Sequence, residues 1–476
     1  MAEFLTDEEA RLVSDLETQL AMKNAANDDA LRYYEGDHQP SHYGLSMPPS
    51  LKDLRIQLGW AGKVVDVNGS RLKFQGWATP GSEDPHGLAK VVAENHLEVI
   101  AHQAHLDALI FGCSFVVVGT GADGEPDPLI TVHSPRTMTA RYSHRTRRLV
   151  SAYSKVCDPV TGEEVATLYQ PNVTTHMWRP EGSGRWYVER DVHNLGRVPV
   201  ALIANRPRTE RPFGRSEITK SIRSAQDRGV CVMANMVVNS EFLAAPQRFV
   251  LGADDKAFAG KSQWELIQGR LLGLRRNQDG ELPEVGQFPQ SSPEPYLAVL
   301  TQLARQVASD ADLPVRYFDE NRNAPTSADA IRADESALVA RAERKQAEFS
   351  RGWLEVAELV LLVRDGAVPE DFSAVRPVWA SAATPTKAAS TDAVVKLVTA
   401  GILPPDSSVV LKMLDLSSFD REQAAKDAAR LAEEKKRMAE EIASGQLSPA
   451  EQNTGRSTGP HLHFANDGED PQNAEE

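Results

Sequence analysis

Two stretches of the sequence carry residue types that bind phosphate groups. Residues 119–124 read GTGADG and match the G-x-G-x-x-G pattern of dinucleotide-binding loops. Such a loop leads into a helix whose N-terminus meets the pyrophosphate, whereas here Pro126 and Pro128 precede another strand-like segment. The string GKS at 260–262 lacks the earlier glycine of a P-loop, because Asp255 stands at that position. The first stretch is therefore predicted to be a hairpin turn, and the second a turn or the start of a helix.

A pair of histidines near the end of the chain could contribute to a zinc site. The string RSTGPHLHF at 456–464 includes His461 and His463 and resembles half of the zinc site of lysostaphin-type cell-wall peptidases. A catalytic zinc needs three protein ligands and a framework that holds them. The other ligands of that family, a His and an Asp, lie upstream in a β-rich domain, but a charged helix is predicted upstream here. We expect no metal site, and a zinc peptidase stays an alternative that bound zinc with activity would favour.

Other candidate catalytic groups lack the partners that catalysis needs. His96, His102 and His105 share one predicted helix, but no constellation of cysteines or carboxylates accompanies them, so they are expected to be surface or core histidines. No G-x-S-x-G motif is present, and paired carboxylates such as Asp254 and Asp255 are most often solvated. The sequence thus predicts no catalytic residue, no cofactor and no enzymatic activity.

Composition and charge limit the class of protein further. The chain has 476 residues, of which 41% are hydrophobic, so it can bury a large core divided over two or more structural units. Its net charge of −15 argues against a protein that grips DNA over a wide surface, because phosphate binding requires a basic surface. No apolar run approaches the ~18 residues of a membrane helix, and the acidic opening MAEFLTDEEARL predicts no export signal. Three widely spaced cysteines favour a reduced, intracellular setting.

The first 200 residues predict helices followed by antiparallel strands. Thr6 and Glu9 form a capping-box pattern that begins the first helix, and residues 84–111 carry the apolar stripe of another. Between Ser114 and Val200 the hydrophobic period changes to two. The expected strands are 115–118, 129–132, 149–156, 165–169, 174–178 and 186–190. Strands that follow one another without intervening helices predict an α+β fold, and the whole chain is expected to be rich in helix.

The second half is predicted to be mostly helical. Helices at 216–243 and from Pro293 flank a small mixed module, in which 248–251 and 271–275 are strand-like. After the polar loop VRYFDENRNAP, the capping-box pattern TSAD opens a helix of roughly 37 residues, about 55 Å at 1.5 Å per residue. The remaining expected segments are short helices at 392–399 and 406–414, a charged helix at 419–443 and a disordered acidic tail at 446–476.

Three of these segments resemble the portal proteins of tailed bacteriophages, in the siphophage branch. They are PFGRSEI at 212–218, LPVRYF at 313–318 and PTSADAIRADESALVARAERKQAEFSRGW at 325–353. The last is the most specific, because the Ser-Ala-x-Ala start of its helix and its KQ-x-x-F centre are typical of the family. The segment AVVKLVTAGILPPDS at 393–407 is similar to the family's C-terminal part. The likeness covers about Leu5 to Glu440.

The resemblance implies the subdomains of a portal subunit. These are a wing, a two-helix stem, a small α/β clip, a long helix that spans the wing, and a helical crown. Their expected bounds are 1–211 for the wing, 212–245 for the first stem helix, 246–292 for the clip, 293–313 for the second stem helix, 314–325 for a tunnel loop, 326–365 for the long wing helix, 366–445 for the crown and 446–476 for the disordered tail.

The resemblance also implies a role. Portal proteins form a homo-oligomeric ring, usually dodecameric, at one capsid vertex, through which double-stranded DNA is packaged and ejected. A virion component assembled in the host cytoplasm is therefore expected, with the terminase large subunit, the head-tail adaptor, the major capsid protein and scaffold as partners, and no membrane. The acidic charge balance suits a ring through which DNA slides. Another head structural protein, a coat or scaffold subunit, stays an alternative, and it would form shells instead of a closed ring.

Two groups of residues are expected to make the functional contacts. In the tunnel loop, arginines, amides and an aromatic ring would touch the passing DNA, while Asp319 and Glu320 keep each contact weak. The tunnel-loop residues are Arg316, Tyr317, Asn321, Arg322 and Asn323. The alternative is a solvated surface loop. In the clip, the residues expected to dock the terminase or the adaptor are Lys261, Trp264, Arg270, Arg275 and Arg276.

Overall fold

The computed structural model describes most of the chain. The described residues are 4–41, 55–82, 84–180, 186–244, 248–251, 284–287, 292–318, 327–383, 387–404, 407–414 and 418–443. The chain divides into two compact units, Met1–Ala383 and Thr384–Glu476. Every pairing between described strands is antiparallel.

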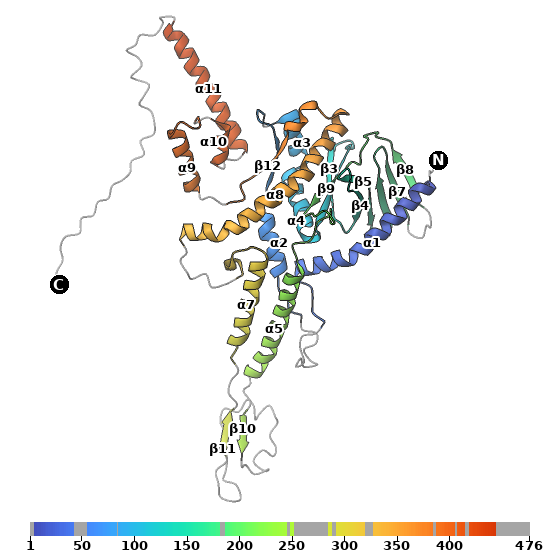
Figure 1. Ribbon diagram of the computed structural model, residues 1–476, viewed down its shortest axis with the longest axis vertical. Coiled ribbons are helices and arrows are strands. Elements are labelled where there is room, and N and C mark those ends of the chain that lie inside the picture. Colours follow the sequence, from blue (N-terminus) through green and yellow to red (C-terminus); the bar gives the residue numbers. More distant parts are fainter. Residues whose placement is uncertain are drawn as a thin grey trace, which may run out of the picture. The chain divides into compact units, whose positions relative to one another are not determined.

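Helix α1 (Asp7–Glu35) begins at the predicted capping box, which is confirmed. The Thr6 hydroxyl accepts from the backbone N–H of Glu9, and the Glu9 carboxylate accepts from the backbone N–H of Thr6. The helix lies along a five-stranded sheet (Figure 1), against which it buries Leu16 and Leu20. The strands follow in chain order and are β4 (Met138–Ser143), β5 (Arg148–Cys157), β6 (Glu164–Tyr169), β7 (Thr174–Arg179) and β8 (Tyr187–Asp191).

A three-stranded sheet of order β3-β2-β9 contributes to the largest apolar cluster of the first unit. Its strands are β2 (Cys113–Gly119), β3 (Leu129–His133) and β9 (Val200–Ala204). The glycine-rich stretch 119–124 lies in the connection between β2 and β3, where the backbone N–H of Glu125 donates to the carbonyl of Ala122 at 2.9 Å. The prediction that this stretch is a turn between strands is confirmed.

The prediction of a single helix over 84–111 is wrong. The structure has a 3-10 turn (Pro85–Gly87), helix α3 (Leu88–Glu94) and helix α4 (Leu97–Phe111). The break falls at His96, whose φ is 49°. The preceding residue, Asn95, is buried, and its side chain donates to the Pro128 carbonyl at 3.0 Å and accepts from the Ile130 N–H at 2.8 Å. These bonds tie the chain to β3 and require a turn between the two helices.

Helix α8 (Ala328–Asp365) packs across the three-stranded sheet, in contact with β2 and β9 (Figure 1). Its N-cap is Ser327, whose hydroxyl accepts from the N–H of Ala330 at 3.2 Å, so the helix begins one residue later than the TSAD pattern predicts. Helix α2 (Trp60–Ser70) and the pair β1 (Phe74–Ala78) and β12 (Arg376–Trp379) complete this region, together with a 3-10 turn (Glu370–Ala374). Residues 366–383 thus lie in the first compact unit.

Helices α5 (Lys220–Ala244) and α7 (Glu294–Asp310) lie side by side and run in opposite directions (Figure 1). Between them in the chain are two paired strands, β10 (Arg248–Leu251) and β11 (Glu284–Gln287). The strand predicted at 248–251 is confirmed, whereas the one predicted at 271–275 falls outside the described residues. A 3-10 turn (Val315–Tyr317) follows α7.

The second unit contains three described helices. They are α9 (Lys387–Thr399), α10 (Ser408–Met413) and α11 (Ser418–Ala443), and α10 contacts both of the others. The two short helices and the charged helix predicted here are confirmed. The tail at 446–476 falls outside the described residues.

Helices combined with antiparallel sheets confirm the α+β class. Five described strands were not predicted, namely β1, β4, β9, β11 and β12. Among the residues that the structure describes, no helix is long and apolar enough to cross a membrane.

Candidate functional site

A group of buried charged side chains, which we call the buried charge cluster, joins the PFGRSEI segment to the centre of α8. Glu217 is 0% exposed, and Lys345 and Arg341 are 2% and 8% exposed. The Lys345 ammonium donates to Glu217 Oε1 and, at 2.7 Å, to Asn205 Oδ1. The Arg341 guanidinium donates to Glu217 Oε2 and, at 2.6 Å, to Asp312 Oδ2. One carboxylate therefore holds α8 against the segment that connects β9 to α5.

The charges of this cluster stabilise one another although they are shielded from water. Burial alone would raise the pKa of Glu217, but the positive charges of Lys345 and Arg341 outweigh it and lower the pKa to about 2. Glu217 is thus ionised at neutral pH. Removing one partner from such a buried set leaves uncompensated charge and typically costs about 3–5 kcal/mol. The cluster consequently fixes the angle between α8 and the chain that leads into α5.

The backbone before Glu217 depends on a glycine. Gly214 has a φ of 67°, and a Cβ at this position would lie 2.2 Å from the carbonyl oxygen of Asn205 and 2.6 Å from that of Gly112. Only glycine allows this approach. The backbone N–H of Glu217 then donates to the carbonyl of Leu109 at 2.8 Å. These contacts fold the PFGRSEI segment against the end of α4 and direct Glu217 toward α8.

The KQ-x-x-F centre of α8 packs around a buried histidine. Phe349 stacks on the ring of His105 with centroids 5.1 Å apart, and the indole N–H of Trp353 donates to His105 Nε2 at 2.8 Å. Burial lowers the pKa of His105 to about 3, so its imidazole is neutral and can donate from Nδ1 to the Leu72 carbonyl. Gln346 donates its side-chain amide to two backbone carbonyls. The expectation of a core histidine is confirmed for His105, which has a structural role.

Two of the expected tunnel-loop residues are described, and both are tied to the start of α8. Arg316 pairs with Asp334 at 3.3 Å and with Glu335. The Tyr317 hydroxyl donates to Glu335 at 3.4 Å and accepts from Arg71 at 3.3 Å. Arg71 also pairs with Glu335 at 3.4 Å. The beginning of the segment is thereby anchored to α8 through a shared carboxylate.

The remaining predicted site residues fall outside the described residues. In the expected tunnel loop these are Asn321, Arg322 and Asn323, and in the expected clip they are Lys261, Trp264, Arg270, Arg275 and Arg276. The GKS string and the pair His461 and His463 also lie outside. Across the ranges that are described, no group of three or more His, Cys, Asp or Glu side chains could hold a metal ion.

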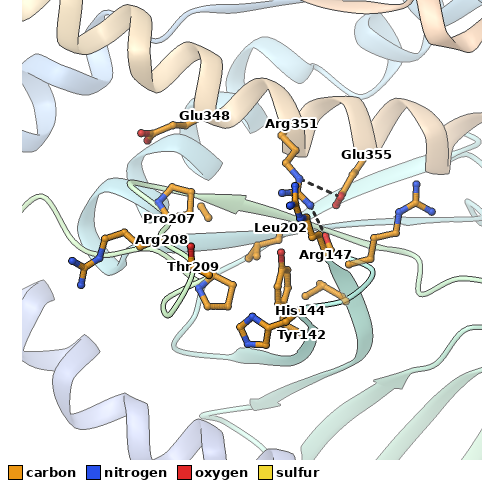
Figure 2. Close-up of a pocket in the computed structure, with 14 residues that line it drawn as sticks. Tyr142, His144, Arg147, Leu202, Pro207, Arg208, Thr209, Glu348, Arg351 and Glu355 are labelled. Atoms are coloured by element: carbon orange, nitrogen blue, oxygen red, sulfur yellow. Dashed lines mark hydrogen bonds and ion pairs between the residues drawn. The ribbon is translucent and has the colours of Figure 1, made fainter.

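Two adjoining cavities of about 450 and 270 Å³, which we call the basic groove, lie beside the buried charge cluster. Figure 2 shows the larger one between the β4–β5 connection, the turn that follows β9, and the side of α8. Glu348 and Glu355 stand on the α8 wall, but arginines predominate in the lining. The lining arginines are Arg147, Arg148, Arg206, Arg208, Arg215, Arg341, Arg344 and Arg351.

Sequence reasoning missed both the buried charge cluster and the basic groove. A signal for the first was available, because Lys345 falls on the apolar stripe of α8 that includes Leu338, Ala342 and Phe349. A lysine in such a stripe is expected to be paired. Its partner Glu217 is 128 positions away, so the pairing itself could not be read from local spacing.

Comparisons with known proteins agree on one family. A family model described as "Phage portal protein, SPP1 Gp6-like" matches residues 18–446. The portal protein of Mycobacterium phage D29 is 30% identical over 417 residues, which cover 83% of this chain and 84% of that protein. The portal protein of Mycobacterium phage L5 is 28% identical over 431 residues, which cover 85% and 87% of the two chains. The three segments singled out in the sequence all lie within the matched region.

Proposed function

This chain belongs to the phage portal protein family, and we propose that copies of it form the closed ring at one capsid vertex through which double-stranded DNA is packaged and ejected. The match over 18–446 carries this proposal, because it includes nearly every described element. The chain is accordingly a structural component of a phage head.

The subdomains of the subunit follow from the element order. We assign the wing to 1–211, the stem to 212–245 and 293–313, the clip to 246–292, the long wing helix to 326–365 and the crown to 366–445. The antiparallel pair α5 and α7 supports the stem, and the β10–β11 pair between them supports the clip. The length of α8 and its packing across the three-stranded sheet support a helix that spans the wing. The pairing of β12 with β1 indicates that residues 366–383 contact the wing.

The proposed partners follow from the position of such a ring. The ring would be a dodecamer that assembles in the host cytoplasm and contacts the major capsid protein and scaffold. The clip would dock the terminase large subunit during packaging and the head-tail adaptor afterwards. The tunnel loop at 314–325 would face the DNA, and the ion pairs of Arg316 with Asp334 and Glu335 would hold the beginning of this loop in place.

Two alternative functions are not favoured. A coat or scaffold subunit would not match a portal model over 18–446. A zinc peptidase would have to depend on the His461 and His463 segment, which lies beyond the matched region.

Electron microscopy of the purified protein tests the proposal most directly. Negative-stain images should show rings with a central hole, and light scattering should give one large species without added ligand or metal, because the copies in a closed ring are held by interfaces between themselves. Only monomers or dimers at micromolar concentration, across several salt conditions, would contradict the proposed ring.

A further inference from the structure

We propose that the basic groove is an intersubunit docking surface, which binds an acidic face of a neighbouring copy of the same chain. The inference rests on the proposed ring and adds to it the surface that holds adjacent subunits together. It concerns residues that belong neither to the expected tunnel loop nor to the expected clip.

The walls of the groove are fixed by contacts within the subunit. Arg206 donates its backbone N–H to Glu348 at 2.9 Å and thus joins the turn after β9 to α8. Within that turn, the backbone N–H of Arg208 donates to the carbonyl of Arg211 at 3.1 Å, and the reverse bond measures 2.8 Å. Arg341 and Lys345 of the buried charge cluster line the smaller cavity and are held there by Glu217. The backbone and the paired side chains of this wall are already ordered, so they lose little conformational entropy when a partner binds.

Several arginines of the groove have no partner of their own. Arg148 pairs with Glu358 at 3.1 Å and Arg351 lies 3.9 Å from Glu355. In contrast, four exposed arginine side chains have no hydrogen bond or ion pair with any described residue, and these are Arg147, Arg208, Arg215 and Arg344. Guanidinium groups that are free of partners among the described residues of the subunit can bind carboxylates through two parallel hydrogen bonds.

The charge of the whole chain indicates where the carboxylates come from. Each copy carries a net charge of −15, so neighbouring copies in a ring repel one another unless opposite charges meet at their contact. A ring is closed by heterologous interfaces, in which one surface of a subunit meets a different surface of the next. In such a contact, the basic groove of one subunit would meet acidic side chains on the surface of the next subunit.

The lining of the groove favours a protein partner over the backbone of DNA. Glu348 and Glu355 stand on the α8 wall among the arginines (Figure 2). A phosphodiester backbone offers only negative charge and would meet these carboxylates unfavourably, whereas a protein surface can present donors to them and acids to the arginines. We therefore assign the groove to a second copy and not to DNA.

Charge reversal in the groove tests this assignment. The variant Arg208→Glu with Arg344→Glu should remain folded, because both side chains are exposed and unpaired among the described residues. It should require a roughly tenfold or higher protein concentration for half-assembly, measured by light scattering and negative-stain microscopy. Far-UV circular dichroism and the thermal midpoint of the unassembled subunit report on folding. The matched control is Arg11→Glu with Lys73→Glu, which changes the net charge equally at exposed positions outside the groove.

Each outcome of this experiment decides between the possibilities. Loss of assembly in the groove variant, with rings retained in the control, supports the proposal. Normal rings in both variants overturn it, and equal loss in both assigns the effect to net charge and also overturns it. If the groove variant forms normal rings but no longer binds a short DNA duplex, the groove binds DNA and the proposal is wrong. If the unmodified chain forms no rings, the proposed function fails, which is a result distinct from all of these.

Discussion

At the scale of single residues, Glu217 shows how the free-energy cost of burying a carboxylate is offset by its ion pairs. A fully buried carboxylate is stable in this protein because two cationic side chains from α8 and the side-chain amide of Asn205 contact it. The family motif PFGRSEI thus contains a glycine that the backbone requires at 214 and an acid that pairs with the helix. Both residues position α8.

The substitution Glu217→Gln should destabilise the subunit by roughly 3–5 kcal/mol, because Lys345 would be left buried without a negative partner and Arg341 would keep only Asp312. Urea denaturation of the unassembled subunit measures the difference in unfolding free energy. The control is Gln19→Ala, at a half-buried position of α1, which removes a single hydrogen bond to the Ala140 carbonyl and should cost less than ~1.5 kcal/mol. Equal stability of Glu217→Gln and the unmodified chain would show that the cluster contributes nothing.

The pH dependence of that difference gives a second readout of the same variant. The pKa of Glu217 falls from an ordinary 4.5 to about 2 in the folded protein, so the carboxylate stabilises the fold fully above pH 4.5 and loses this effect as the pH falls toward 2. The stability advantage of the unmodified chain over Glu217→Gln should therefore be constant near neutral pH and shrink between pH 4.5 and 2. If this stability difference does not change between pH 4.5 and 2, the ionised carboxylate of Glu217 is not its cause.

At the scale of elements, the closeness of α8 to β9 decides how the first unit packs. Gly352 lies where the helix crosses the strand, and a Cβ at this position would be 2.4 Å from Ile203 Cδ1 and 2.6 Å from the carbonyl oxygen of Leu202. A backbone oxygen cannot move aside as the end of a side chain can. The glycine is thus required by packing, although it is unfavourable in a helix interior.

Gly352→Ala separates these two effects because they have opposite signs. Helix propensity alone predicts a gain of roughly 1 kcal/mol, whereas the contact with Leu202 predicts a net loss of about 1–3 kcal/mol. Chemical denaturation of the unassembled subunit measures which effect dominates. A variant more stable than the original chain would show that α8 and β9 are not as close as described.

Local sequence patterns correctly predicted the helices and strands whose formation depends on residues close together in the sequence. The capping box at Thr6 and Glu9, six strands with period two, and the helices of the second unit were all predicted in this way. The break between α3 and α4 was not, because it depends on hydrogen bonds between Asn95 and the β3 region more than 30 positions away. The pairing of β1 with β12 joins residues some 300 positions apart, and for the same reason no local pattern indicated it. The candidate site shows the same limit, since its motifs were identified but the ion pairs between them were not.

At the scale of the whole molecule, the acidic tail from 446 should be dispensable for assembly. Its composition is polar and carries few apolar residues, so it cannot contribute much buried area to a ring. A chain that ends at Gly445 should form rings as the full chain does, judged by negative-stain microscopy. In the full chain, His461→Ala with His463→Ala should leave the zinc content and the assembly unchanged. Loss of rings on truncation would assign the tail a structural role.

The passage of DNA is also a property of the whole ring, and we expect substitutions in the expected tunnel loop to change it. Arg316 pairs with Asp334 and Glu335, so Arg316→Glu would bring like charges together and disturb the anchoring of the loop as well as its charge. Arg322→Glu is therefore the cleaner variant, and the double variant should have the larger effect.

Rings of Arg322→Glu should assemble normally, because the substitution lowers the charge of each subunit by two units and changes no residue of the described apolar clusters. In a reconstituted prohead, these rings should package DNA more slowly or stall, since the added charges would face the phosphate backbone at every subunit. The matched control Arg11→Glu changes the net charge equally on the exposed surface of α1 and should package at the normal rate. If Arg322→Glu rings also package at the normal rate, the loop does not line the channel, and a solvated surface loop becomes the correct interpretation.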